Sequence, residues 1–181
     1  MRAAAMGRRS ISVIGGLTLL LLTTACSRGA GAAQTDPRAA QNPSGLPIPR
    51  YVTLKSNPVK ARSGPSDEHR VLWSYQVRGL PVQVVGETKD WRRICDSDGQ
   101  LSWVNKLTTD GRRAVLRTQA GPTPILTHPR ADAAVSAYLA HDALAALDHC
   151  QAGWCKIKVG GSGGWISADA VWGVADGPQC R

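Results

Sequence analysis

The sequence predicts an all-β protein built from two small domains in tandem. Short apolar runs alternate with polar residues, as in residues 80–86, and this period-two pattern is typical of β-strands. Landmark residues also recur at a nearly constant spacing: Pro65 and Pro129 lie 64 residues apart, Trp91 and Trp154 lie 63 apart, and Trp103 and Trp165 lie 62 apart. This regularity indicates an internal duplication of one β unit.

The first copy, residues 51–113, is expected to contain about five short strands. Gly, Pro and Asp residues break the apolar pattern between them, as turn residues do. The strand segments are 59–62, 71–75, 80–85, 91–94 and 103–104. Several short strands in about sixty residues are typical of a small barrel or sandwich. A domain of this size is near the lower limit for a self-sufficient core.

This first copy resembles a bacterial SH3-like domain. The resemblance rests on an ordered set of motifs: Val59-Lys-Ala-Arg62-Ser-Gly-Pro65, Pro81-Val-Gln-Val-Val85, Asp90-Trp91 and Trp103-Val104. It implies a small SH3-like barrel, a fold that binds and positions ligands, mostly in cell-envelope proteins and beside cell-wall enzymes. Resemblance of fold does not by itself establish a function.

The second copy, residues 114–181, carries corresponding motifs at 123–129, 153–157 and 164–166. One segment competes with this assignment, because residues 131–148 are rich in Ala and Leu and favour a helix by intrinsic propensity. The duplication requires two strands there instead. We expect strands, since tertiary context overrides weak local propensity.

Residues 1–26 have the features of a secretory signal peptide: a basic start, a short apolar core and small residues after it. The stretch Leu22-Thr-Thr-Ala-Cys26 resembles a lipoprotein cleavage box, so Cys26 is expected to become the lipidated N-terminus. Two alternatives remain. Cleavage after residues 30–32 would release a soluble periplasmic protein, and Arg8-Arg9 raises a twin-arginine export signal.

The composition of residues 27–50 predicts a flexible linker. Ala, Gly, Gln, Pro and Ser dominate it, and such a segment cannot bury enough apolar surface to become ordered. A tether of about 23 residues would hold the domains roughly 25 Å from an anchor. That length is suited to a lipoprotein.

The net charge of +9 is unevenly distributed. The first copy has eleven basic and seven acidic residues, hence +4, whereas residues 114–181 contain five of each. A basic surface attracts anionic partners. For an exported protein these are phospholipid headgroups, lipopolysaccharide or the carboxylates of peptidoglycan stems. Nucleic acid is not expected as a partner, because the chain carries an export signal.

The five cysteines predict disulfides. Lipidation or removal of Cys26 leaves an even four in an oxidising compartment. Cys150 and Cys155 flank a turn between two expected strands, where facing residues come close to disulfide range. Cys95 and Cys180 then form the second pair by elimination.

The same hairpin position of the first copy holds Glu87 and Arg92, at identical spacing. We therefore expect an opposite-charge pair in one copy where the other has the thiol pair. Facing side chains at such a position interact directly across the two strands.

Metal binding and catalysis are the competing interpretations of the cysteines. His141 and His149 could join Cys150 and Cys155 in a zinc site, but the tight Cys spacing of structural zinc sites is absent. A catalytic Cys–His pair needs a base within hydrogen-bond reach and a partly exposed, electropositive site. We expect no third, larger domain that would host one. We expect no metal, no cofactor and no enzymatic activity.

Aromatic residues beside cations are the candidate ligand-binding residues. If Ile94 and Ile157 face the core, strand alternation turns their odd-spaced neighbours outward. These neighbours are Trp91, Arg93, Trp154, Lys156 and Lys158. An exposed Trp beside cations is typical of a platform for a peptide or glycan. Core packing in a duplicated barrel would explain the recurrence of the Trp residues equally well.

Together these observations predict an exported, periplasmic, lipid-anchored protein that binds or scaffolds peptidoglycan or an envelope protein and does no chemistry. Two alternatives remain. One is a cell-wall hydrolase of the Cys–His peptidase type, and the other is a purely structural periplasmic protein.

Overall fold

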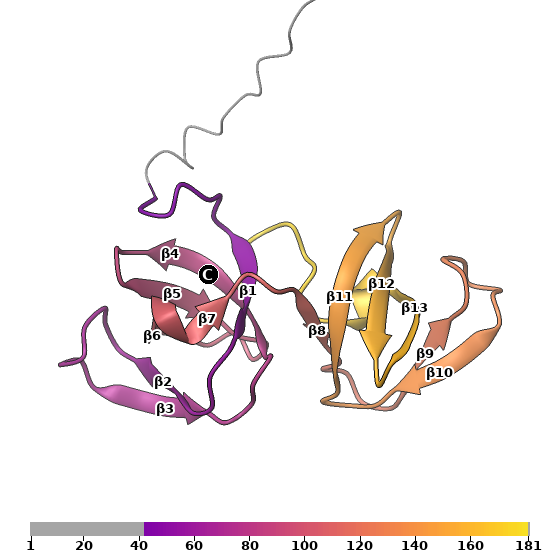
Figure 1. The fold of residues 1–181 in the computed structure, drawn as a ribbon, viewed down its shortest axis with the longest axis horizontal. Coiled ribbons are helices and arrows are strands. Elements are labelled where there is room, and N and C mark those ends of the chain that lie inside the picture. The colour runs from indigo at the N-terminus through magenta and orange to yellow at the C-terminus, as the bar shows by residue number, and fades with distance from the viewer. Residues whose placement is uncertain (1–41, 181) are drawn as a thin grey trace, which may run out of the picture. The chain divides into compact units, whose positions relative to one another are not determined.

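The computed structural model describes residues 42–180. In this range the chain forms two antiparallel β-sheets and two short 3-10 helices, with no α-helix (Figure 1). The predicted signal peptide, the lipidation site Cys26 and residues 27–41 of the predicted linker lie outside the described residues. Within residues 42–180, no helix has the length and apolar character needed to span a membrane.

The first sheet has seven strands in the spatial order β3-β2-β6-β5-β4-β1-β7. They are β1 (Arg50–Leu54), β2 (Val59–Arg62), β3 (Val71–Tyr75), β4 (Pro81–Glu87), β5 (Trp91–Cys95), β6 (Leu101–Asn105) and β7 (Thr109–Asp110). A 3-10 helix, η2 (Lys106–Thr108), connects β6 to β7. The central strands β4, β5 and β6 are neighbours in both sequence and space, as short turns between antiparallel strands allow.

The second sheet has six strands in the order β10-β9-β13-β12-β11-β8. They are β8 (Ala114–Leu116), β9 (Thr123–Leu126), β10 (Val135–Leu139), β11 (Leu144–Gln151), β12 (Trp154–Val159) and β13 (Ser162–Ser167). A 3-10 helix, η3 (Ala168–Ala170), follows β13 as η2 follows β6. The order matches the first sheet strand for strand from β3 to β1, so the predicted duplication is confirmed.

Strands β10 and β11 occupy the segment in which local propensity favours a helix. Leu139 on β10 and Ala145 on β11 are 1% and 3% exposed in the second core. The propensity differences among ordinary residues are at most about 0.7 kcal/mol per residue. Burying a Leu side chain contributes about 1.5–3 kcal/mol, so packing decides the structure and the expectation of two strands is confirmed.

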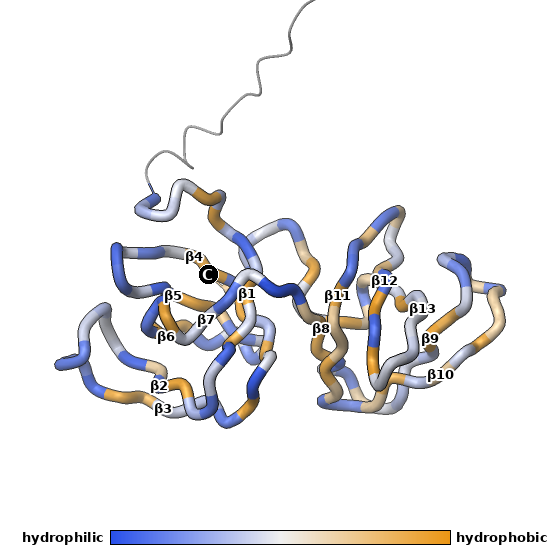
Figure 2. The backbone as a smooth tube through the Cα atoms, viewed as in Figure 1, coloured by the Kyte–Doolittle hydropathy of each residue, from blue (hydrophilic) through white to orange (hydrophobic). Residues whose placement is uncertain are grey.

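Each domain has its own apolar core. The first consists of Val52, Leu54, Val59, Val82, Val84, Ile94 and Val104. The second consists of Val115, Ile125, Leu139, Ala145, Cys155, Ile157, Ile166 and Val171. Hydrophobic stretches fall within the strands of both sheets, and the connecting turns are largely hydrophilic (Figure 2). The apolar residues of the period-two sequence pattern are therefore the residues buried in the two cores.

The end of the predicted linker belongs to the folded structure. The backbone N–H of Ser44 donates to Oε1 of Glu87 at 3.2 Å. Nη2 of Arg50 lies 2.6 Å from Oε2 of Glu87, whose side chain is only 1% exposed. The prediction of a flexible linker up to residue 50 is therefore corrected for residues 42–50, which are held by a buried carboxylate at the end of β4.

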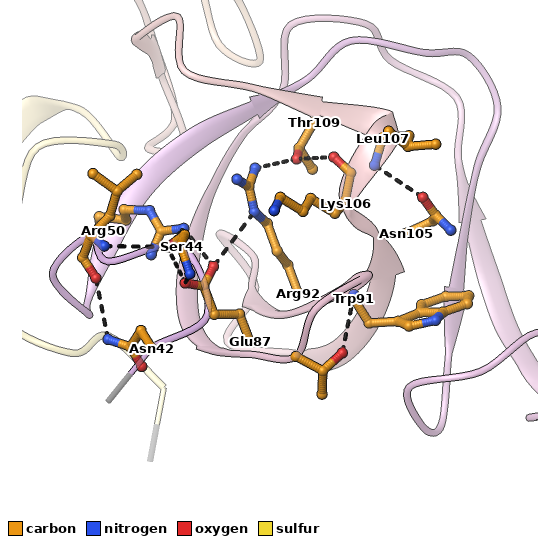
Figure 3. Close-up of polar contacts among 12 residues, drawn as sticks. Asn42, Ser44, Arg50, Glu87, Trp91, Arg92, Asn105, Lys106, Leu107 and Thr109 are labelled. Carbon is orange, nitrogen blue, oxygen red and sulfur yellow. Dashed lines mark hydrogen bonds and ion pairs between the residues drawn. The ribbon is translucent and has the colours of Figure 1, made fainter. Parts of the chain in front are cut away.

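The predicted facing position of Glu87 and Arg92 is confirmed by their register on β4 and β5. Nε of Arg92 lies 3.9 Å from Glu87, farther than Arg50, and the Arg92 guanidinium also donates to Thr109 (Figure 3). Burial by itself raises the pKa of Glu87. Hydrogen bonds from Ser44 and Arg50, together with the Arg50 charge, outweigh it and lower that pKa.

Both predicted disulfides are present. Cys150 and Cys155 face each other on β11 and β12 with a Cα–Cα distance of 4.0 Å. Cys95 and Cys180 are joined with a Cα–Cα distance of 5.8 Å. The C-terminal segment is also held by Gln83, whose Nε2 donates to Gly177 O at 2.8 Å and whose Oε1 accepts from the backbone N–H of residue 179 at 2.9 Å. The tail is thereby fixed to the first domain.

Candidate ligand-binding groove

A groove of about 250 Å³ lies where β2, β5 and η2 of the first domain come together, lined by Pro58, Lys60, Arg62, Asp67, Trp91, Asn105 and Thr108. A second groove of about 370 Å³ shares Asn105 and is lined by Lys89, Asp90, Lys106 and Leu107. We call these two grooves together the basic groove. They combine an indole ring, an amide, four cations and the two carboxylates of Asp67 and Asp90, and this excess of positive charge suits a polar, anionic ligand.

Trp91 is fixed in the basic groove by the start of β5. Its backbone N–H donates to Oγ1 of Thr88 at 3.1 Å, which closes the turn before the strand. Its register partner on β6 is Asn105, so the two side chains lie on the same face of the sheet. Trp91 is 8% exposed, and it forms part of the groove wall rather than a protruding platform.

Asn105 positions the 3-10 helix beside Trp91. Its side-chain Oδ1 accepts from the backbone N–H of Leu107 at 2.9 Å, which caps η2 (Figure 3). This cap orients the helix so that the Leu107 side chain is 75% exposed. The groove therefore has an apolar contact point at its rim as well as polar groups within it.

Arg62 forms another part of the groove wall. Its guanidinium lies over the Trp91 ring, 5.9 Å from the centroid, within the range of a cation–π contact. It also donates to the carbonyl oxygens of Asp67 and His69 at 2.7 and 2.8 Å, and to Oδ1 of Asp67 at 2.9 Å. These bonds use most of its donors, so Arg62 shapes the loop between β2 and β3.

The other three cations are available to a ligand. Lys60 and Lys89 are exposed, and Lys106 is half-buried. None of the three has a carboxylate within ion-pair distance in residues 42–180. A concave site with an excess of positive charge raises the local concentration of anionic ligands. The basic groove is thus arranged to attract carboxylate or phosphate groups.

The structure separates the five residues that the sequence selects for binding. Trp91 lies in the basic groove but is buried, so the expectation that it is exposed is wrong. Arg93 is exposed on the same strand and faces Trp103 on β6. In the second domain Trp154 and Lys156 are half-buried, and Lys158 is exposed opposite Gly163. Strand alternation alone does not reveal that neighbouring side chains cover an outward-facing Trp.

The second domain has lost the cations of this groove. Register identifies the equivalent positions, since Trp154 faces Ser167 as Trp91 faces Asn105, and Leu126 faces Trp165 as Arg62 faces Trp103. At the matched places Lys60, Arg62, Lys89 and Lys106 become Pro124, Leu126, Ala152 and Ala168. Leu107 is replaced by Asp169. The same fold therefore carries a basic groove in one copy only.

Sequence reasoning missed Lys60, Lys89, Lys106 and Asn105 as site residues. They lie on three different elements, β2, the turn before β5, and the β6–η2 junction, so no local pattern joins them. The uneven charge of the two copies was the available signal. A position-by-position alignment of the copies would have shown which cations the second copy lacks.

The described residues include no cluster of three or more His, Cys, Asp or Glu side chains placed to hold a metal ion. The four cysteines in residues 42–180 are all paired in disulfides. The side chains of the basic groove can bind a ligand through charge, hydrogen bonds and contact with the groove wall.

No curated protein matches this chain. Solved structures similar to it include NlpC2 and NlpC1 from Trichomonas vaginalis, each at 17% identity. The first has a TM-score of 0.33 over 73% of this chain and 52% of that chain. The second has a TM-score of 0.31 over 70% of this chain and 46% of that chain. This chain thus spans about half the length of each.

A family model described as bacterial SH3 domain matches residues 55–111 and 119–173. The two matched segments contain β2–β7 of the first sheet and β9–β13 of the second, and together they cover more than half of the chain. Domains of this family commonly bind components of the cell wall or envelope. The protein belongs to the bacterial SH3 domain family and carries two copies of the domain in tandem.

Proposed function

We propose that this protein is a non-catalytic binding module of the cell envelope that holds peptidoglycan through the basic groove of its first domain. One observation carries the proposal: four cations line the groove in the first copy, and none occurs at the matched positions of the second. Both copies form the same sheet, so the fold does not require these cations. Their presence in one copy is explained by a ligand.

The ligand chemistry follows from the groove. Peptidoglycan stems are short peptides with free carboxylates, and Lys60, Lys89 and Lys106 supply unpaired ammonium groups for them. The exposed Leu107 side chain offers an apolar contact to the peptide. Charge complementarity of this kind governs partner choice and association rate more than affinity.

Export is part of the proposal. The two disulfides support folding in an oxidising compartment, and the N-terminal sequence supports a lipid anchor on Cys26. In cells that produce the protein, Cys26→Ser is expected to abolish incorporation of labelled lipid and to leave the chain uncleaved at that site. A Cys26→Ser chain that is still cleaved and soluble would contradict the anchor and leave the groove proposal intact.

The alternative of a Cys–His peptidase requires a thiolate nucleophile. Disulfide bonding of all four cysteines in residues 42–180 supports the binding function instead. Incubation with purified peptidoglycan separates the two functions, because a hydrolase releases soluble fragments and a binding module only sediments with the polymer.

The test is sedimentation with purified peptidoglycan. The groove variant replaces Lys60, Lys89 and Lys106 by Gln, and a matched control replaces Lys55, Arg70 and Arg78, three exposed cations of the same domain, by Gln. Exposed charge contacts contribute about 0.2–1 kcal/mol each, so we expect the groove variant to bind about tenfold more weakly. The control should stay within about twofold. Equal weakening of both variants would show that only net charge matters, and a wild type that does not sediment would refute the proposal.

A further inference from the structure

A second arrangement of cations and Trp lies on the outer face of the second domain. Three side chains stand side by side across β11, β12 and β13, since His149 faces Lys156 and Lys156 faces Trp165. Nζ of Lys156 lies 6.0 Å from the centroid of the Trp165 ring. The His149 ring meets the same indole edge-on at 5.4 Å. We call these three residues the Trp165 row.

The Trp165 row is open to solvent. His149 is exposed, while Lys156 and Trp165 are half-buried. On the far side of Trp165 its register partner is Leu126, which is 5% exposed, so the indole has an apolar neighbour on one side and two nitrogen-bearing groups on the other. Lys156 has no carboxylate within ion-pair distance in residues 42–180; Asp148 approaches His149 alone, with Oδ1 at 3.7 Å from Nδ1.

The first domain repeats the core of this row in the same register. Arg93 faces Trp103 as Lys156 faces Trp165, and Arg62 takes the place of Leu126. The groove cations were lost from the second copy, yet this pairing of a cation with a Trp is present in both. Neither fold nor core requires a cation on an outward-facing strand position.

We propose that the Trp165 row binds a carboxylate-bearing sugar ring of an acidic glycan. The negatively charged face of an indole attracts the weakly positive C–H groups of a sugar ring that stacks on it. The Lys156 ammonium beside the ring binds the sugar carboxylate, and a charge-assisted hydrogen bond of this kind is about twice as strong as a neutral one. The His149 ring offers a further polar contact to a hydroxyl group.

A sugar explains the shape of the row better than a peptide does. The three side chains lie next to one another on the surface of a sheet, and a flat ring can cover an indole and reach a neighbouring ammonium at once. An extended peptide is recognised through pockets for alternate side chains or through a free sheet edge. Lys156 and Trp165 lie on β12 and β13, which are interior strands of the sheet, whereas β11 pairs with β8 only over residues 144–146, so His149 lies on the part of β11 that β8 does not pair.

The test uses trigalacturonate as an acidic trisaccharide and maltotriose as a neutral one, titrated into the full chain by calorimetry. We expect trigalacturonate to bind, maltotriose to bind at least fivefold more weakly, and Lys156→Gln to reduce trigalacturonate affinity about fivefold. Trp165→Leu, which keeps an apolar side chain, should reduce trigalacturonate affinity more than Lys156→Gln does, because it removes the stacking surface itself. Lys158→Gln removes an exposed cation two residues away, opposite Gly163, and should leave affinity unchanged.

Three outcomes would overturn the proposal: no binding of trigalacturonate, equal loss with Lys158→Gln, or tighter binding of triglutamate than of trigalacturonate. The groove variant with Lys60, Lys89 and Lys106 replaced by Gln is included as well. It also serves as the background for the Lys156→Gln and Trp165→Leu comparisons, because the basic groove itself attracts carboxylates, and both losses of affinity should persist in it. Failure of the row and failure of the basic groove are therefore distinguishable.

Discussion

Replacing Glu87 by Gln tests the buried ion network that fixes residues 42–50 to the first domain. The Glu87 side chain is 1% exposed, and those of Arg50 and Arg92 are 12% and 11% exposed. Removing one partner of a buried ion pair costs about 3–5 kcal/mol, because the remaining charges stay buried without compensation. Gln has nearly the shape of Glu and can still accept a hydrogen bond from Ser44, so we expect the free energy of unfolding to fall by about 3 kcal/mol, the lower end of that range.

The assay is equilibrium unfolding in urea, with the free energy of unfolding extrapolated to water. Asp132→Asn is the matched control, because its ion pair with Arg130 is exposed on both sides, at 79% and 67%, and such pairs contribute at most about 1 kcal/mol. Limited proteolysis should also cut Glu87→Gln within residues 42–50 before the wild type. A Glu87→Gln loss no larger than that of the control would refute the role of the network.

Three further predictions concern stability. The Cys95–Cys180 disulfide joins residues that are 85 positions apart in sequence, and Cys150–Cys155 joins residues that are 5 apart. Because loop-closure entropy grows with the logarithm of loop length, removing the first disulfide should lower the free energy of unfolding by about 2.5 kcal/mol more than removing the second. Equal losses of that free energy in urea unfolding would contradict this prediction. Gly164→Ala should lower the free energy of unfolding by about 1–3 kcal/mol, since a Cβ there would crowd Ile125 and lie 2.8 Å from Leu126 O. Thermal unfolding of both variants measures this loss, and Gly163→Ala should be nearly neutral in the same experiment. Folding lowers the pKa of Glu87 from 4.5, so the contribution of its carboxylate to stability is complete above pH 4.5 and is lost as the pH falls through the folded-state pKa. The difference in free energy of unfolding between wild type and Glu87→Gln should therefore shrink as the pH falls below 4.5. A difference that grows in acid would contradict the predicted direction.

The fold was largely predictable because apolar and polar residues alternate along the strands with the same two-residue period as buried and exposed side chains. Alternation around Ile94 and Ile157, and the constant spacing of the Trp residues, placed the strands and the duplication. The even cysteine count and the facing geometry gave both disulfides. What local sequence could not give was the docking of residues 42–50, since Ser44 is held by Glu87, a residue 43 positions away. Composition predicts whether a segment can order itself, and this one is ordered by another element.

The candidate site was only partly predictable. Trp91 was selected from the sequence and lines the candidate groove, but its burial depends on Arg62 and the loop that Arg62 fixes, which strand parity does not encode. Lys60 and Lys106 come from separate elements and meet only in the folded sheet. Arg93 and Lys156 were chosen as neighbours of Trp91 and Trp154 in sequence, whereas the structure pairs them across strands with Trp103 and Trp165.

We propose that only the first domain recognises the carboxylates of peptidoglycan stems. The most direct measurement is a titration of the isotope-labelled chain with soluble peptidoglycan fragments whose stem carboxylates are free or amidated, followed by amide and indole chemical shifts. We predict shifts at Trp91, Asn105 and Leu107 with the free acids, about tenfold weaker binding after amidation, and no shifts at Trp154 and Ser167. Equal shifts in both domains, or binding that is unaffected by amidation, would contradict the account.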